Sequence, residues 1–376
     1  MDEEVAPLPE GVPGVAVPWA PPNWTYAFPV DCDATVPMSN AFRVAVYLMY
    51  CLVFLVALVG NGLVMYCVVS SPRMRTATNF WLLNLAVGDI LMTVLCVPFS
   101  FVPTLLLQYW PFGVELCHMV SFCQAVSVLV SAYTLVAISV DRYVAIMWPL
   151  RPRLSRRLSH GAMLTVWVFA VITAMPIPMV TRLSQPDSWH AHCDKWVCQE
   201  EWPSPLHRHY YTLALMTLQY FAPLVVLLYT YTRIAVVIWG KRTPGEAENL
   251  RDQRLAKAKR KMVTMMITVV AAFTICWLPF NLLVTVWTYN ESLGDQQWLP
   301  GLYFACHWLA MSHSCLNPII YCWMNARFRQ SFKTAVLCAR FPRRLPVVQH
   351  HVAAGAAAVT CTSFRSQHRK THLEDM

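Results

Sequence analysis

The sequence predicts an all-α membrane protein: a bundle of seven membrane-crossing helices followed by a short amphipathic eighth helix. Hydrophobic residues make up 57% of the 376 residues and charged residues only 13%, whereas soluble domains carry about 25% charged residues. The apolar residues are also clustered in long runs, and a helix needs about 20 of them to cross a bilayer. Runs of sufficient length occupy residues 42–70, 78–107, 115–147, 161–181, 209–239, 262–288 and 298–323.

Basic residues are distributed unevenly among the segments that connect these runs. Of the 29 Lys and Arg residues, 25 lie in 71–77, 142–160, 233–261 and 324–376. Cytoplasmic loops are enriched in Lys and Arg, so we expect a multi-pass plasma-membrane protein with its N-terminus extracellular and its C-terminus cytoplasmic. Thirteen of the 20 acidic residues fall on the outer side. This excess of acids would attract cationic ligands. Alternatively, the outer loops simply lack Lys and Arg because the membrane topology requires it.

The runs divide the chain into four parts. Two residues outside the membrane-crossing bundle are candidate modification sites. Asn23 begins the glycosylation sequon Asn23-Trp24-Thr25 in a Pro-rich arm that is expected to be disordered. Cys338, beside the amphipathic segment, is a candidate for palmitoylation. The parts are the extracellular arm at 1–41, the bundle at 42–325, the interfacial amphipathic helix at 326–338 and the cytoplasmic tail at 339–376.

The polar residues inside the runs bear on the class of protein. No Ser/His/Asp set and no His/Cys cluster with metal-ligand spacing is visible, so we expect neither an enzyme nor a metal centre. A transporter would usually show related halves with broken helices, and a channel a filter-like loop or rings of charge; neither pattern is seen, though both classes remain alternatives. Asp89 lies mid-membrane and needs a polar partner or a bound cation. Side chains that could reach it are Asn61, Ser131, His313, Ser314 and Asn317.

Each predicted helix also carries a short motif. The motifs are Gly60-Asn61, Asn84-Leu85-Ala86-Val87-Gly88-Asp89, Cys117 followed by Asp141-Arg142-Tyr143, Trp167, Pro223, Cys276-Trp277-Leu278-Pro279 and Asn317-Pro318-Ile319-Ile320-Tyr321. Alone, Arg142 is also explained as an arginine that reaches lipid phosphates at the membrane edge. Taken in order, the motifs resemble the rhodopsin-like G-protein-coupled receptors from about residue 40 to residue 340.

This resemblance implies three internal sets of residues. The activation switch is expected in Asp141, Arg142, Tyr143, Trp277, Pro279, Asn317, Pro318 and Tyr321. A structural sodium ion, with no other cofactor, is implied beside Asp89, Asn61, Ser131 and Asn317, a neighbourhood in which His313 is unusual. The implied disulfide joins Cys117 to Cys198 in the second outer loop, which leaves Cys193 and Cys32 as a possible second pair.

The resemblance also implies a ligand class. Gln124 lies seven residues after Cys117 and faces the pocket in this family, where a neutral amide suits a carboxamide better than an amine. With Gln219 and His307 at comparable depth, and Trp277 among the pocket residues, the set resembles neuropeptide Y-like receptors, which bind amidated peptide termini. Each of these residues is also explained as a hydrogen bond between helices.

Longer stretches narrow the resemblance to arthropod RYamide receptors, which respond to peptides ending in Arg-Tyr-amide. The ligand's arginine would need an acid, for which Glu200, Glu201 and Glu291 are the candidates. Alternatives of the same fold are receptors for neuropeptide Y or F, tachykinin, prolactin-releasing peptide, a lipid or an amine. Implied partners are a heterotrimeric G protein, receptor kinases, arrestin and membrane lipid, but no nucleic acid. The stretches are 84–93, 108–113 and 147–153.

Overall fold

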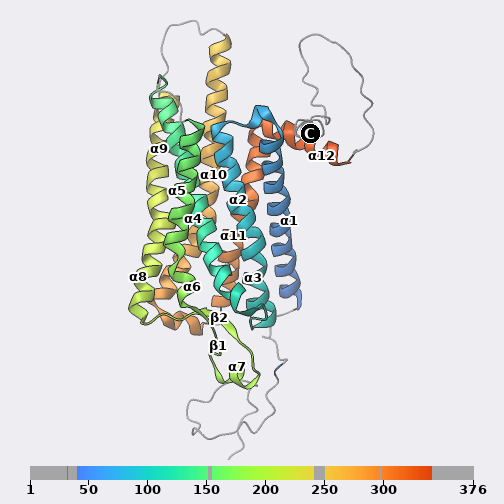
Figure 1. Ribbon diagram of the computed structural model, residues 1–376, viewed down its shortest axis with the longest axis vertical. Helices are drawn as coiled ribbons and strands as arrows, with labels where there is room; N and C mark the ends of the chain where they lie inside the picture. Colours follow the sequence, from blue (N-terminus) through green and yellow to red (C-terminus); the bar gives the residue numbers. More distant parts are fainter. Residues whose placement is uncertain (1–31, 33–39, 151–154, 241–249, 297, 341–376) are drawn as a thin grey trace, which may run out of the picture.

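The computed structural model describes residue 32 and residues 40–150, 155–240, 250–296 and 298–340. Within these residues the helices stand side by side as one elongated bundle (Figure 1). The membrane spans, in chain order, are α1 (Asn40–Ser70), α2 (Ala77–Leu91) with α3 (Val97–Phe101), α4 (Gly113–Met147), α5 (Arg156–Ala174) with α6 (Pro176–Val180), α8 (Pro205–Met216) with α9 (Ala222–Gly240), α10 (Leu250–Tyr289) and α11 (Leu299–Met324).

Wide helical turns interrupt the second and fifth spans beside prolines. The π-helical segments η2 (Met92–Cys96) and η3 (Val102–Leu107) lie on either side of α3, and η4 (Thr217–Phe221) precedes Pro223. Proline has no backbone N–H, so the carbonyl four residues earlier loses its helical donor. A π-turn absorbs such a defect, and it is frequent at functional sites. Gln219, a predicted ligand residue, lies in η4.

The seventh span is less apolar than the others. Among the described residues, six helices are long and apolar enough to cross a membrane by composition, and α11 is not one of them. Its polar residues account for this: His307, His313, Ser314 and Asn317 are all buried. Polar side chains in a membrane helix normally face the bundle interior. The span predicted at 298–323 is nonetheless present, displaced by one residue at each end.

Some helices begin well before the predicted apolar runs. The largest difference is at α10, which starts at Leu250 although the run was predicted from residue 262. Its first turns are rich in Lys and Arg, so they carry no apolar signal although they are helical. Figure 1 shows this part of α10 standing beyond the bundle near α9. Hydropathy therefore marked the membrane-embedded part of each helix rather than the whole helix.

A two-stranded antiparallel sheet covers one end of the bundle. Its strands are β1 (Thr181–Ser184) and β2 (Val197–Glu200), with Leu183 opposite Cys198 and Thr181 opposite Glu200. A disulfide from Cys198 to Cys117 ties β2 to the start of α4. A second disulfide joins Cys32 to Cys193, after α7 (Ser188–His192), so residue 32 is held on the same loop.

The segment α7 is held in turn by a short acid–histidine contact. The carboxylate of Asp187 accepts a hydrogen bond from the backbone N–H of His190 (2.9 Å) and lies 2.8 Å from its ring Nδ1. Partial burial acts to raise the pKa of Asp187, but the hydrogen bonds from His190 outweigh it and lower the pKa below its ordinary value. The other ring nitrogen lies 3.2 Å from the carbonyl oxygen of Gln108, so the loop contacts the turn before α4.

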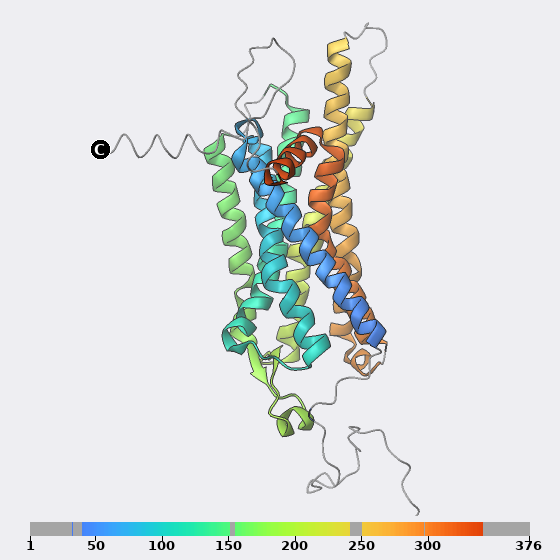
Figure 2. The same cartoon turned by 90° about the vertical axis from the view of Figure 1, so that its right-hand side faces the viewer.

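The amphipathic helix lies at the opposite end of the bundle (Figure 2). This helix, α12 (Ala326–Arg340), runs across the end of α1 and ends two residues after the predicted boundary at 338. Phe328 and Phe332 are buried against the bundle, and the ring of Phe328 packs 5.6 Å from that of Tyr321. An apolar face turned inward with basic residues outward is typical of a helix in the membrane interface.

Candidate functional site

The predicted ligand residues Gln124 and Gln219 lie on helices that pack against each other. Gln124 is on α4, two turns deeper than the disulfide-bonded Cys117, and η4 with Gln219 packs on α4. Both amides are partly buried, and no hydrogen bond to another described residue satisfies either of them. A partly buried amide offers two donors and an acceptor, so these groups are available to a polar ligand.

The third member of the predicted set, His307, is already engaged. Its ring Nδ1 lies 2.9 Å from the hydroxyl of Tyr50 on α1, and the side chain is almost fully buried. The ring of Tyr303 stacks on it at 5.9 Å, and Phe280 contacts it edge-on at 5.7 Å. In this arrangement His307 connects α1, α10 and α11 through Nδ1 and its ring contacts, while no hydrogen bond to a described residue uses its Nε2.

The acidic candidates differ in where the hairpin places them. Side chains alternate along a strand, so Glu200 shares a face of β2 with Cys198, whose disulfide points into the bundle. The carboxylate of Glu200 accepts a hydrogen bond from the indole of Trp202 (2.9 Å) and lies close enough to Tyr211 on α8 to interact with it electrostatically. Glu200 at the end of the strand and Glu201 just beyond it are both exposed. Glu291 lies in η5 (Glu291–Asp295), and its side chain is outside the described residues.

Below these residues, Asp89 is the centre of a buried polar cluster. Its Oδ2 accepts a hydrogen bond from Asn317 (2.8 Å), and its Oδ1 accepts one from the hydroxyl of Ser314 (3.2 Å). The ring Nε2 of His313 lies 3.4 Å from the same Oδ1. Ser131 approaches from α4 beside Gly88. The structure therefore brings the predicted polar residues together around one carboxylate.

Asn61, on α1, has a specific task in this cluster. Pro318 has no N–H, so it cannot donate to the carbonyl of Ser314 four residues earlier. The side-chain amide of Asn61 donates to that carbonyl instead, at 2.9 Å. The neighbouring Gly60 makes this approach possible, because a Cβ there would lie 2.6 Å from the ring of Pro318. Gly60, Asn61 and Pro318 thus form one contact between α1 and α11.

The groups around Asp89 present a mixed set of atoms to the implied sodium ion. Hard cations take oxygen ligands, and two of the three groups on this carboxylate, Asn317 and His313, present nitrogen atoms. The third is the hydroxyl of Ser314. The amide nitrogen of Asn61 donates to backbone carbonyls, and its Oδ1 is buried without a partner among the described residues.

A tryptophan lies directly above this cluster. Trp277 is almost completely buried on α10, and its ring packs 5.5 Å from His313 and 6.2 Å from Phe273. Its indole N–H has no partner among the described residues. Two residues later Pro279 interrupts the hydrogen bonding of α10, and proline is a common cause of helix kinks. A bulky side chain with an unpaired N–H at a weakened turn is suited to change position.

At the inner end of the bundle Arg142 holds two helices together. Its guanidinium pairs with Asp141, with Nε 3.0 Å from Oδ2, and donates to the hydroxyl of Thr78 on α2 at 2.7 Å. A third contact reaches the sulfur of Met262 on α10 at 3.7 Å. Tyr143 packs between Trp148 and Tyr229. Arg142 is thus occupied by residues of its own helix, of α2 and of α10.

Comparison with known proteins assigns the family. A family model described as 7 transmembrane receptor (rhodopsin family) matches residues 60–321. The chain belongs to this receptor family. That result confirms the predicted fold and receptor class, and the prediction that the chain is not an enzyme.

The individual relatives are receptors for peptides by name. The chain is 56% identical over 295 residues to the RYamide receptor of Drosophila melanogaster, covering 78% of this chain but 63% of that protein. It is 52% identical over 330 residues to the RYamide receptor of Tribolium castaneum, covering 85% of this chain and 88% of that protein. Tachykinin-like peptides receptor 99D of Drosophila melanogaster is 37% identical over 294 residues, covering 77% and 56%. The chain therefore spans less than two thirds of the two Drosophila receptors.

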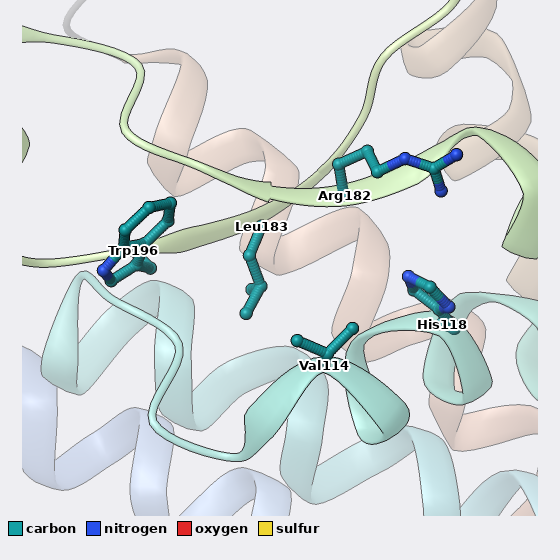
Figure 3. A pocket seen from close by; sticks show the side chains of 5 residues that line it. All are labelled: Val114, His118, Arg182, Leu183 and Trp196. Atoms are coloured by element: carbon teal, nitrogen blue, oxygen red, sulfur yellow. The ribbon is translucent and has the colours of Figure 1, made fainter.

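A hollow of about 540 Å³ in this receptor lies outside the predicted ligand set. It opens between the first turns of α4 and the β-hairpin, and it is lined by Val114, His118, Arg182, Leu183 and Trp196. Figure 3 shows the apolar side chains of Val114, Leu183 and Trp196 together, with His118 and Arg182 at the other side. Its charged group is a cation, so this hollow is unsuited to an arginine of a ligand.

Thr78 and Tyr50, the partners of Arg142 and His307, were not predicted from the sequence. Neither partner was signalled by a motif, because each is brought to the site only by helix packing. Asn23 and the side chain of Cys338 lie outside the described residues.

Proposed function

We propose that this chain is a plasma-membrane receptor for an amidated neuropeptide of the RYamide type that activates a heterotrimeric G protein. Relatives named RYamide receptors share 52–56% identity with most of the chain, well above the 37% of the tachykinin-type relative. The observation that carries the proposal is the pair of unsatisfied carboxamides, Gln124 and Gln219, on facing helices.

The chemistry of the pair suits a carboxamide terminus. An amide of the ligand can donate to one glutamine oxygen and accept from the other amide nitrogen, so neither partner needs a charge. A free carboxylate would enter without a cation among these groups, and burying an unpaired charge is costly. The neutral side chains also disfavour an amine, which would need an anion at this depth.

The arginine of the ligand is assigned to Glu200. This carboxylate lies on the bundle-facing side of β2 beside Tyr211, at the mouth that a peptide must pass to reach Gln124. Arginine pairs with carboxylates through two parallel hydrogen bonds, which also fixes the orientation of the peptide. The charge of the other outer acids would attract a cationic peptide before it binds.

Orientation follows from the two ends of the bundle. Both disulfides lie at the hairpin end, and disulfides persist in oxidising, extracellular surroundings. The basic segments lie at the other end, as the positive-inside rule requires for the cytoplasm. We therefore place the hairpin outside the cell and α12 inside.

Activation is a shift between two arrangements of the helices. We assign the arrangement in which Arg142 contacts Asp141, Thr78 and Met262 to the closed one. A peptide that binds better to an arrangement with α10 moved away from α4 shifts the population toward it. Arg142 then becomes available to a G protein, and receptor kinases and arrestin are proposed to recognise the same open surface.

The test is calcium mobilisation in cells that express the receptor with a promiscuous G protein. A peptide ending in Arg-Tyr-amide is compared with its free-acid twin on the receptor and on a Gln124→Leu variant. We expect the amide to be about 100-fold more potent than the acid. The acid would lose the hydrogen bond made by the ligand's amide and would bury an unpaired charge, which together cost about 2–3 kcal/mol. Gln124→Leu should reduce this ratio.

Two results would redirect the proposal. Equal potency of amide and acid on the surface-expressed receptor would contradict the carboxamide site. A response confined to tachykinin-like peptides would keep the family but assign the receptor to its other named relatives.

A further inference from the structure

The hollow between α4 and the β-hairpin has an apolar wall and a polar wall. Val114, Leu183 and Trp196 form the apolar wall, and Arg182 and His118 form the polar one (Figure 3). Its volume of about 540 Å³ lies within the range of about 300–1,000 Å³ that small-molecule sites occupy. None of the described residues that line it is acidic. The hollow is therefore large enough for a small molecule and is cationic on one side.

Both polar side chains of the hollow have nitrogen atoms without a partner. The guanidinium of Arg182 donates to the carbonyl oxygen of Thr181 at 2.8 Å, and it forms no ion pair with a described residue. The ring Nε2 of His118 is buried and has no hydrogen-bond partner among the described residues. No such bond fixes the tautomer of His118, so Nε2 can carry a hydrogen and donate it.

An anion would satisfy both of these groups at once. An exposed guanidinium alone is satisfied by water, but a buried ring nitrogen on the same side of the hollow needs a hydrogen-bond partner. Arginine pairs with a carboxylate through two parallel hydrogen bonds, and such an acceptor can also take the hydrogen of Nε2. The polar wall therefore favours a carboxylate.

Contacts behind the apolar wall hold it in place. The indole N–H of Trp196 donates to Asp194 at 3.2 Å, and its backbone carbonyl accepts from the N–H of Trp110 at 2.6 Å. Leu183 packs on the cluster that contains the buried Trp110. Val114 and Trp196 nevertheless remain 50% and 44% exposed. Exposed apolar groups that are gathered together mark a site of interaction.

The hollow is separate from the site proposed for the peptide. Successive residues of an α-helix are turned by about 100°, so Gln124 shares a face of α4 with Cys117. Val114 and His118 lie about 80° and about 120° around the helix from Gln124. None of the residues that line the hollow belongs to the predicted ligand set. The hollow can thus be filled while the peptide site is empty.

We propose that this hollow binds a small amphiphilic carboxylate, a molecule with one carboxylate group on an aryl or alkyl body. The carboxylate accepts hydrogen bonds from Arg182 and His118, and the body packs on Val114, Leu183 and Trp196. A neutral molecule of the same shape leaves the polar wall without an anion. An acid without the body leaves the apolar wall exposed. Recognition therefore requires both parts of the ligand.

The bound molecule contacts two elements that move relative to each other when the receptor unfolds. Val114 and His118 belong to α4, and the other three lining residues belong to the hairpin and the loop within it. A ligand that binds the folded state alone raises its stability. Binding is thus measurable as an increase in Tm. The carboxylate can be dissolved in water or held in the outer leaflet, since the chemistry of the two sources is the same.

The experiment uses the purified full-length receptor in phosphatidylcholine nanodiscs without any peptide. Phenylbutyrate is the dissolved probe and oleate the membrane-resident one, and each is compared with its neutral twin, phenylbutanol or oleyl alcohol. The dependence of Tm on probe concentration gives the affinity. At about five times Kd, we expect each carboxylate that binds to raise Tm by about 2 °C. The alcohols should have no effect.

Variants test the polar wall. Arg182→Gln should weaken carboxylate binding by about 10-fold, as expected for the loss of a charged hydrogen-bond donor. His118→Phe keeps a ring but removes the nitrogen atoms, and it should weaken binding by about 3- to 10-fold. Lys195→Gln is the matched control. It removes the same charge from the same loop, but Lys195 lies over the ring of Tyr109 and does not line the hollow.

A reversal of charge separates direct contact from a structural role. Arg182→Glu should reject phenylbutyrate and respond to phenylbutylamine, because the sign of the polar wall has changed. A residue that only supported the fold would not exchange one ligand for the other.

The outcomes are decisive in both directions. Stabilisation by phenylbutyrate supports the site with a dissolved ligand, and stabilisation by oleate alone supports it with a ligand from the membrane. Equal shifts by an acid and its alcohol, no shift by either acid, or equal affinity in Arg182→Gln and Lys195→Gln would overturn the proposal. If Arg182→Gln does not fold, an unchanged affinity in His118→Phe would do the same. No peptide is present, so the result does not depend on the ligand proposed above.

Discussion

At the scale of single residues, the structure separates side chains that have a partner from those that await one. His307, which stays a predicted ligand contact, is buried and uses one ring nitrogen to contact Tyr50. Gln124 on α4 and Gln219 in η4 have no hydrogen-bond partner among the described residues. Specificity for a peptide terminus is therefore better sought in the two glutamines and in the acid above them. His307 acts on the pocket by fixing the packing of Tyr303 and Phe280.

Glu200 at the end of β2 and Glu201, the next residue, provide a test of where the ligand's arginine binds. Glu200→Gln should lower the potency of an Arg-Tyr-amide peptide by about 10- to 100-fold, as expected for the loss of one charged partner in a pair. Glu201→Gln is the matched control, because it removes the same charge from the outer loop at an exposed position. Dose–response curves for the peptide and for its citrulline analogue measure the effect. Equal losses in both variants would indicate general attraction instead of a pair.

At the scale of helices, the contact between α1 and α11 explains why short motifs are linked. Pro318 frees a carbonyl of α11, Asn61 satisfies it, and Gly60 lets the two helices approach. The Gly60-Asn61 motif on α1 thus compensates for the hydrogen bond that Pro318 removes from α11. The steric part of this contact, between Gly60 and Pro318, is measurable with single methyl groups.

Two glycines of α1 give that measurement. Gly60→Ala places a Cβ 2.6 Å from Pro318, whereas Gly62→Ala meets nothing within 4 Å. We expect Gly60→Ala to destabilise the receptor by about 1–3 kcal/mol, as overpacking generally does. Gly62→Ala should be neutral or slightly stabilising, because alanine favours a helix over glycine. Thermal unfolding of both variants in the same detergent decides the point, and a smaller loss for Gly60→Ala than for Gly62→Ala would contradict it.

The same scale shows what the sequence could and could not predict. Apolar runs located the spans, because a membrane imposes a length on each helix. They could not locate the start of α10, because its first turns are polar. They also could not locate the π-turns of η2, η3 and η4, which depend on local proline geometry. Motifs identified Arg142 and Asp89. Thr78 and Tyr50 needed atomic positions, because helix packing alone brings them to Arg142 and His307.

At the scale of the whole molecule, the two ends of the bundle differ in chemistry. The hairpin end carries both disulfides and exposed acids, and the α12 end carries most of the basic residues. A bilayer sorts such ends, since basic loops are retained in the cytoplasm. In the orientation proposed above, the acidic, cross-linked end faces the peptide, and the contact of Arg142 faces the G protein. Binding and signalling are separated by the thickness of the membrane, so the helices must transmit the change.

This arrangement predicts which epitopes are accessible on intact cells. A short tag placed before Met1 should be stained by antibody without permeabilisation, and a tag after Met376 should be stained only after it. The physical reason is the cost of moving the basic segments across the bilayer, which is about 2.5–3.5 kcal/mol for an Arg or Lys at the centre of a helix. Replacing the basic residues between Lys257 and Lys261 by acids should reduce the fraction of molecules with this orientation. Staining of the C-terminal tag on intact cells that express the otherwise unmodified chain would show the opposite orientation, with the Glu200 site on the cytoplasmic side.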